Sequence, residues 1–377
     1  MRLGVASCAV AALGLARPAL AEPARTLLRA ETGLEYDSNA GRVEEVRGSA
    51  SPGVVGSPVA RAMASFDLAA SPGSRQALAL SGGIAAKRFT HGGVRDEDAL
   101  VGQASGTWSV LVAGRTSLAL VGSYYDVFQR RTIEARDFRS MTPVLRLDQG
   151  LGGSGLVSLG AGHRWFTYKP HGDYDFAGPT AFAGYRHLFT AKVDVDSDAA
   201  DWELGASASL ERRSFQGLRC VDAEQCPGAM EAGHRRRDLF WIIGAEATRT
   251  GAFLAGGGLA VHGNRSNSFG EPLLRGVAHL RGVFLLPWQL SLSGRAELLA
   301  TRYLDAVPLR RDLMTGSPLV SIEDESRSTV RFELARPIGA HLDAGVRYAF
   351  FTNEITGGPV SFRRHTALVF LAVSLER

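Results

Sequence analysis

Most of this chain alternates between apolar and polar residues with a period of two. Residues 202–211, which read WELGASASLE, show the pattern without interruption. Successive side chains of a β-strand point to opposite faces, so such a segment predicts a strand with one apolar and one polar face. The same alternation recurs in residues 26–38, 290–298 and 342–348. Helical periodicity is nearly absent, and the chain is therefore expected to be all-β.

About sixteen such segments follow one another, and fourteen to eighteen strands are compatible with the pattern. The connections alternate between long ones, such as 39–58, 213–236, 303–326 and 352–362, and mostly tight ones, such as 113–115 and 152–154. Eight long and seven short connections indicate strands that run up and down between two unlike ends. The predicted fold is a closed antiparallel transmembrane β-barrel. The segment centres lie near residues 32, 65, 82, 104, 120, 144, 161, 182, 206, 242, 257, 279, 295, 331, 345 and 370.

The N-terminus has the features of an export signal. Arg2 is followed by an uncharged, mostly apolar stretch over residues 3–16, and residues 19–21 (ALA) form an A-x-A cleavage site. The predicted organisation is a signal peptide over residues 1–21 and a barrel over residues 22–377. No later segment offers eighteen consecutive apolar residues, so no helix is expected to span a bilayer.

An exported chain with this pattern has two interpretations. In a soluble sandwich or barrel the apolar faces meet in a core, whereas in a membrane barrel they contact lipid and the polar faces line the lumen. The alternation of long and short connections favours the membrane barrel. The five tryptophans favour it too, because they fall near the predicted strand ends, where amphipathic rings meet the membrane interface. Sixteen strands enclose a lumen wide enough for water.

Charged residues lie on the polar faces of the predicted strands. An Arg that faced lipid at the midplane would cost roughly 2–4 kcal/mol, so these side chains are expected to point into the lumen. There they either pair across strands as a structural ladder or form an electrostatic constriction in a pore. The candidate lumen or constriction residues are Arg29, Glu31, Arg61, Asp67, Arg146, Arg164, Arg281, Arg295, Glu297, Arg331, Glu333, Asp343 and Arg347.

The sequence offers little for catalysis or cofactor binding. No G-x-S-x-G motif occurs, and the nine histidines are scattered without metal-ligand spacing. The G-x-G-x-x-G at residues 150–155 is followed by a strand instead of a helix, which indicates a glycine-rich turn. No catalytic residue, metal or cofactor is expected, and a net charge of +4 implies no nucleic-acid partner. Cys220 and Cys226 are expected to form a disulfide in an oxidising compartment.

Residues 33–40, which read GLEYDSNA, resemble the opening strand of barrels that serve exopolysaccharide and related surface-export systems. The whole mature chain resembles Gram-negative outer-membrane β-barrel proteins. The resemblance implies a place in the cell outer membrane, in contact with its lipid. It also implies a barrel through which a polymer crosses, with periplasmic export proteins as partners.

The function expected from the sequence is that of a passive conduit for hydrophilic cargo, without enzymatic activity. Extracellular polysaccharide export is the first hypothesis, on the strength of the GLEYDSNA segment. A general solute porin is the alternative. A structural or adhesion barrel, whose loops bind outside partners, is the third hypothesis.

Overall fold

The computed structural model describes residues 24–41, 45–46, 54–129, 137–169, 172–189, 201–220, 234–305, 328–352, 360–361 and 363–377. The helices in these ranges are all too short or too polar to cross a membrane. The predicted signal peptide and Cys226 lie outside the described residues. Cleavage of the signal peptide and the Cys220–Cys226 disulfide therefore stay predictions.

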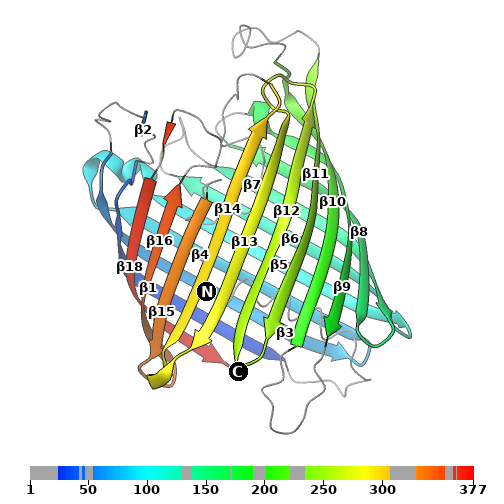
Figure 1. The fold of residues 1–377 in the computed structure, drawn as a ribbon, viewed down its shortest axis with the longest axis horizontal. Helices are drawn as coiled ribbons and strands as arrows, with labels where there is room; N and C mark the ends of the chain where they lie inside the picture. The colour runs from blue at the N-terminus through cyan, green and yellow to red at the C-terminus, as the bar shows by residue number, and fades with distance from the viewer. Residues whose placement is uncertain are drawn as a thin grey trace.

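Sixteen antiparallel strands close into one barrel (Figure 1), as the alternation predicts. Each strand pairs with its neighbours in sequence, and β1 pairs with β18 to complete the ring. The two-residue strands β2 (Glu45–Val46) and β17 (Val360–Ser361) form a separate small sheet. The barrel strands are β1 Arg25–Asp37, β3 Ser57–Gly73, β4 Gln76–Phe89, β5 Ala99–Ala113, β6 Thr116–Gln129, β7 Phe138–Leu151, β8 Gly155–Tyr168, β9 Phe176–Phe189, β10 Asp201–Leu218, β11 Arg235–Thr250, β12 Phe253–Ser266, β13 Leu273–Leu285, β14 Ser291–Tyr303, β15 Ser328–Pro337, β16 Leu342–Thr352 and β18 Arg363–Glu376.

The two ends of the barrel differ, as the connection lengths predict. The short-turn end holds seven connections and both ends of the described barrel, where the backbone N–H of Thr26 donates to the backbone oxygen of Arg377 at 2.9 Å. Two of its turns place Gly114 and Gly152 at φ values of 49° and 59°, which glycine adopts without a steric cost. The other eight connections, mostly longer, form the long-loop end.

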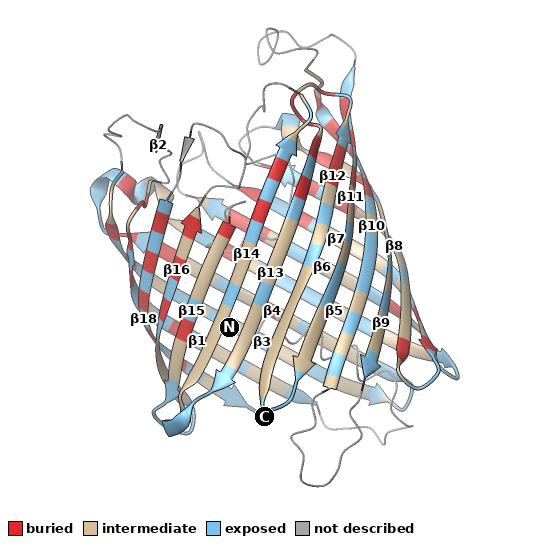
Figure 2. Cartoon of the chain, viewed as in Figure 1, coloured by how far each residue is buried: buried red, intermediate tan, exposed pale blue. Residues whose placement is uncertain are grey.

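The outer wall is apolar along the middle of the strands. Leu34, Leu259 and Leu280 point outward and expose 73%, 69% and 66% of their surface. A contiguous apolar surface around the whole molecule is incompatible with water and matches the lipid-facing band of a transmembrane barrel. The apolar faces therefore lie outside, as predicted. Buried residues gather instead toward the long-loop end (Figure 2).

The segment GLEYDSNA closes the barrel. A Cβ at Gly33 would overlap the backbone oxygen of Val369, so only glycine lets β1 approach β18 this closely. The Arg364 guanidinium binds the Asp37 carboxylate with both Nε and Nη2, the shorter contact being 2.5 Å. The Asn39 side chain donates to the backbone oxygen of Arg363 at 3.3 Å. These contacts assign the segment to the seam between the first and last strands, and they carry no information about cargo.

Two glycines on the inner face of β9 differ in their surroundings. A Cβ at Gly178 would overlap the backbone oxygen of Arg212 on β10. A Cβ at Gly184 would meet nothing closer than the backbone oxygen of Ala206, at 3.8 Å. The backbones of β9 and β10 thus approach each other unusually closely at Gly178 but not at Gly184.

The Gly178→Ala variant is expected to be less stable than the wild type by about 1–3 kcal/mol, because the added methyl group must push β9 away from β10. The midpoint temperature of unfolding, followed by the heat-dependent migration of the barrel in SDS gels, measures the effect. Gly184→Ala is the matched control and should leave the midpoint unchanged. Equal midpoints for both variants would contradict the close approach.

Candidate functional site

All thirteen candidate lumen residues lie on the inner face of the barrel, since their neighbours in sequence point outward. On β1, for example, Glu31 is 6% exposed whereas the outward Leu28 and Leu34 are 48% and 73% exposed. Asp67 and Asp343 occupy the inner face of β3 and β16 toward the short-turn end. That these residues form a constriction stays a prediction.

One sector of the wall, from β15 through β18 and β1 to β4, carries ion pairs that together cross five strand boundaries. Arg347 donates to Glu31 with Nη1 and Nη2 at 3.0 and 3.1 Å, and to Glu333 with Nε at 2.7 Å. Glu35 in turn accepts from Arg61 at 2.5 Å and from Lys87 at 3.0 Å. Three carboxylates and three cations therefore offset one another here, which is the structural ladder that the sequence analysis allows.

A second set of ion pairs lies on the inner face of β8, β10 and β11. The Glu211 carboxylate accepts from Arg164 at 3.3 Å and from Arg213 at 3.0 Å. Next to it on β11, Arg236 pairs with Asp238 at 2.6 Å. Arg164 lies on the inner face and pairs with a carboxylate, which is one of the two arrangements that the sequence allows.

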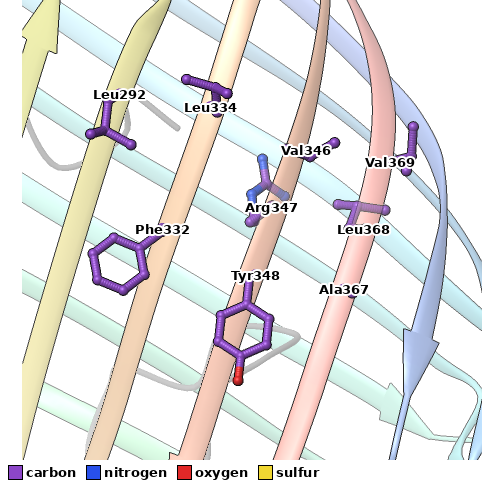
Figure 3. A pocket seen from close by; sticks show the side chains of 9 residues that line it. All are labelled: Leu292, Phe332, Leu334, Val346, Arg347, Tyr348, Ala367, Leu368 and Val369. Atoms are coloured by element: carbon purple, nitrogen blue, oxygen red, sulfur yellow. The ribbon is translucent and has the colours of Figure 1, made fainter.

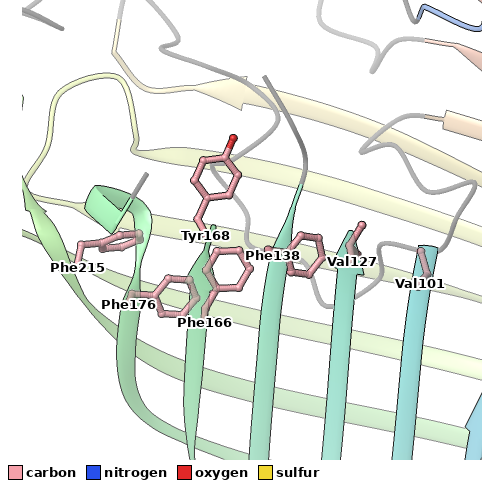
Figure 4. Packing of buried hydrophobic residues seen from close by; sticks show 7 residues of the cluster. All are labelled: Val101, Val127, Phe138, Phe166, Tyr168, Phe176 and Phe215. Carbon is pink, nitrogen blue, oxygen red and sulfur yellow. The ribbon is translucent and has the colours of Figure 1, made fainter. Parts of the chain in front are cut away.

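Five aromatic rings line the inner wall near the long-loop end, one on each strand from β6 to β10. Figure 4 shows four of them, Phe138, Phe166, Phe176 and Phe215. Their centroids follow one another at 5.5, 5.2, 4.9 and 5.0 Å, so each ring contacts the next. The expectation that inward faces are polar throughout is wrong at this level. The rings bury one another and take little contact with water. They are Tyr125, Phe138, Phe166, Phe176 and Phe215.

Arginines cover this row of rings. The guanidinium carbons of Arg164 and Arg213 lie 5.5 and 5.1 Å from the centroid of Phe176, and that of Arg236 lies 4.1 Å from the centroid of Phe215. Cations over ring faces are stabilised by the ring quadrupole. The same arginines bind the carboxylates of the second set, so rings and ion pairs form one packed layer.

The feature with the clearest chemical consequence is a row of three arginines. Arg281 on β13 is the direct partner of Arg295 on β14, and Arg295 is the direct partner of Arg331 on β15. Arg281 donates to the hydroxyl of Thr248 at 3.3 Å, and Arg295 pairs with Glu297 at 2.8 Å. Like charges directly opposite each other destabilise a sheet. The row thus places three like charges next to one another on one wall, whereas a purely structural ladder would alternate the two signs.

Several members of these networks were not among the predicted residues. Arg213 and Arg236 fall in 213–236, which the sequence suggests is a connection, although β10 and β11 extend well into it. Arg364 stands just after the expected connection 352–362, near the start of β18. The signal that could have identified these residues is the alternation of inward and outward positions along a strand. Arg236 shares the inward phase of Asp238 and Phe240, but the run of arginines at 235–237 conceals the alternation.

A hollow of about 270 Å³ lies on the outer face of the barrel wall, over strands β14 to β18 (Figure 3). Phe332 and Tyr348 project into the region of the outer surface that contacts lipid, and both are about half exposed. Its apolar side chains suit a lipid tail and not a hydrophilic solute. The remaining outward side chains around it are Leu292, Leu334, Val346, Ala367 and Val369.

Within the described ranges, His, Cys, Asp and Glu form no group of three that could hold a metal ion. The candidate site is therefore the charged inner wall, in which the arginine row places like charges in register.

Comparison with known proteins finds likeness only at the level of the fold. No protein-family model and no curated protein matches the sequence. Among solved structures, OccK11 of Pseudomonas aeruginosa is 12% identical, with 94% of this chain and 96% of that chain covered and a TM-score of 0.43. OccAB1 of Acinetobacter baumannii is 9% identical, with 94% and 96% covered and a TM-score of 0.45. A bacterial polysaccharide outer membrane secretin is 8% identical, with 93% and 99% covered and a TM-score of 0.40. Such weak likenesses do not reveal what this chain binds.

The Arg347→Met variant is expected to lose about 3 kcal/mol of stability, because Glu31 and Glu333 are left without their shared cation. Arg295→Met is the control, since Arg295 is exposed and its pair with Glu297 is worth little. The midpoint temperature of unfolding in SDS gels should fall for the first variant and hardly change for the second. A midpoint for Arg347→Met equal to that of the control would show that the pair does not stabilise the seam.

Glu271 predicts a pH dependence at the long-loop end. It lies between β12 and β13, where burial raises the pKa of its carboxyl from 4.5 to about 7 although Arg236 opposes the shift. The folded state therefore keeps a proton that the unfolded chain loses near pH 4.5, and the attachment of this connection should weaken as pH rises from about 4.5 to about 7. Hydrogen exchange of residues 267–271, corrected for intrinsic rates, should show less protection at pH 8 than at pH 5. Glu271→Gln should abolish the difference, and its persistence would exclude Glu271 as the cause.

Proposed function

We propose that this protein is an outer-membrane pore through which small hydrophilic solutes diffuse passively, with a preference for anions. A closed sixteen-strand barrel with an apolar exterior and a charged interior supports a channel. The predicted signal peptide supports export, and an exported membrane barrel belongs in the outer membrane. With the termini on the periplasmic side, the long loops face outward.

The arginine row is the observation that carries the preference for anions. Rings and clusters of Arg in a pore favour anions over cations. Arg281, Arg295 and Arg331 stand directly opposite one another in register, which places three guanidinium groups side by side on the lumen wall. Guanidinium groups bind carboxylate and phosphate in a bidentate fashion, so solutes with these groups are the favoured class.

Polysaccharide export is the less favoured function. Its support was the GLEYDSNA segment, and the contacts of Gly33, Asp37 and Asn39 give that segment a role in barrel closure. An uncharged polymer would also gain nothing from the arginine row. An adhesive function of the loops finds no specific support among the described residues.

The pore is tested in planar bilayers with purified protein. Steady conductance is expected, and under a KCl gradient the reversal potential should lie on the chloride side of zero. The triple variant Arg281→Gln, Arg295→Gln and Arg331→Gln should move the reversal potential toward the potassium value. The double variant Arg146→Gln, Asp148→Asn is the matched control, because it removes an ion pair of 2.9 Å and no net charge.

Two results would oppose this function. A silent barrel would rule out the pore, and an unchanged reversal potential in the triple variant would rule out the role of the arginine row. In cells, deletion should slow uptake of small anions and leave secreted polysaccharide unchanged. Loss of the polysaccharide with normal uptake would instead favour export.

A further inference from the structure

Three arginines form a patch on the outer wall of the barrel, separate from the lumen. Arg212 on β10 pairs in register with Leu239 on β11, which pairs in turn with Arg265 on β12. Arg237 lies two residues beyond Leu239 on the same face of β11. We call Arg212, Arg237 and Arg265 the outer arginine patch.

The alternation along each strand directs these side chains outward. Arg213, next to Arg212, is 1% exposed and pairs with a lumen carboxylate. Arg236 and Asp238, on either side of Arg237, are 5% and 2% exposed and pair with each other inside the barrel. All three arginines of the patch are themselves exposed. They therefore project from the face that contacts the membrane.

The patch lies at the edge of the apolar band. Leu239 is eleven residues from Thr250, the end of β11 at the short-turn end. At roughly 3.3 Å per residue and a tilt of about 40°, this is roughly 28 Å along the membrane normal. An apolar band of a transmembrane barrel is about 25 Å tall. The rung of Leu239 is thus at the level of the lipid headgroups on the long-loop side.

The strands below the patch fit this placement. Ile243 and Val261 point outward and are 58% and 42% exposed, as expected of side chains that contact lipid tails. Trp241 lies between them and the patch, with its ring against Gly263, where a Cβ would overlap the ring. A tryptophan at this level is typical of the membrane interface. The order from the middle outward is therefore aliphatic side chains, an indole and then guanidinium groups.

The described strands around the patch do not offset its charge. Strands are about 4.8 Å apart, so Arg212 and Arg265 lie roughly 10 Å from each other, with Arg237 about 7 Å from Leu239 between them. Across the described strands β9 to β13, no outward-facing residue is acidic. Three like charges so close repel one another unless an anion joins them. Three Arg side chains, each several ångströms long, are able to converge on one phosphate.

We propose that the outer arginine patch binds a phosphate of a membrane lipid in the leaflet on the long-loop side. In an outer membrane this leaflet contains phosphorylated glucosamine lipid, so lipid A is the probe. The proposal takes from the proposed function only the location, which selects the lipid, and it does not require an open pore. Guanidinium groups bind the phosphate, and the aliphatic side chains and Trp241 contact the acyl chains and the interface.

Native mass spectrometry of the full barrel in detergent, titrated with lipid A, tests the proposal. The variant Arg212→Gln, Arg237→Gln, Arg265→Gln should bind lipid A roughly tenfold more weakly or worse, since one charge-assisted hydrogen bond alone is worth about this factor. The matched control is Arg88→Gln, Arg302→Gln, Arg363→Gln, which removes three exposed arginines from the same end of the barrel. These stand on β4, β14 and β18, each with two strands between it and the next. The control should bind like the wild type.

Further measurements keep the outcomes distinct. Heat-dependent migration in SDS gels verifies that both variants fold, and the charge-preserving replacement of the patch by Lys should restore part of the binding. Equal binding by the two Gln variants, or equal binding of lipid A and phosphatidylcholine by the wild type, would overturn the proposal that the patch binds a lipid phosphate. Patch-dependent preference for phosphatidylglycerol over lipid A would instead contradict the outer-membrane location. Conductance should be the same in wild type and patch variant, so a failed pore and a failed patch are separate results.

Discussion

A sheet in a membrane has to satisfy every backbone hydrogen bond within itself, and this constraint governs the whole molecule. Lipid offers no partner for an unpaired N–H or C=O group, so the sheet must close on itself. Closure here depends on one seam, where β1 meets β18. Gly33 permits the close approach, and the pair between Asp37 and Arg364 fixes the strands beside it. The inside and the outside of the molecule, and hence both proposed sites, exist only because this seam forms.

Once the sheet is closed, period-two alternation gives every strand one wet and one lipid-facing side. The charged residues of the inner face are arranged in two ways. Around Arg347 and around Glu211, cations and carboxylates neutralise one another, and these pairs hold neighbouring strands together. At Arg281, Arg295 and Arg331, three like charges stand directly opposite one another. Functional sites are where local rules such as the alternation of charge are broken, which is why this row of like charges suggests selectivity.

The sequence predicts the architecture well because alternation is a local property. The thirteen lumen residues could be assigned to the inner face from the alternation around them, as with Glu31 between the outward Leu28 and Leu34. Register is not local. That Arg281, Arg295 and Arg331 stand opposite one another depends on the pairing of three strands, and no single segment encodes it. The inward Phe138 and Phe176 were missed for another reason. They begin their strands, where an apolar residue on the polar phase is taken for the end of a connection.

The row of five rings has a mechanical consequence. Because each ring touches the next, β6 to β10 are tied sideways by side chains as well as by backbone hydrogen bonds. Tightly packed side chains resist shear, so this arc of the barrel should move as one stiff plate. Any widening or narrowing of the pore at the long-loop end then has to come from the remaining strands or from the loops. A closure driven by voltage or by a ligand would therefore move one side of the barrel more than the other.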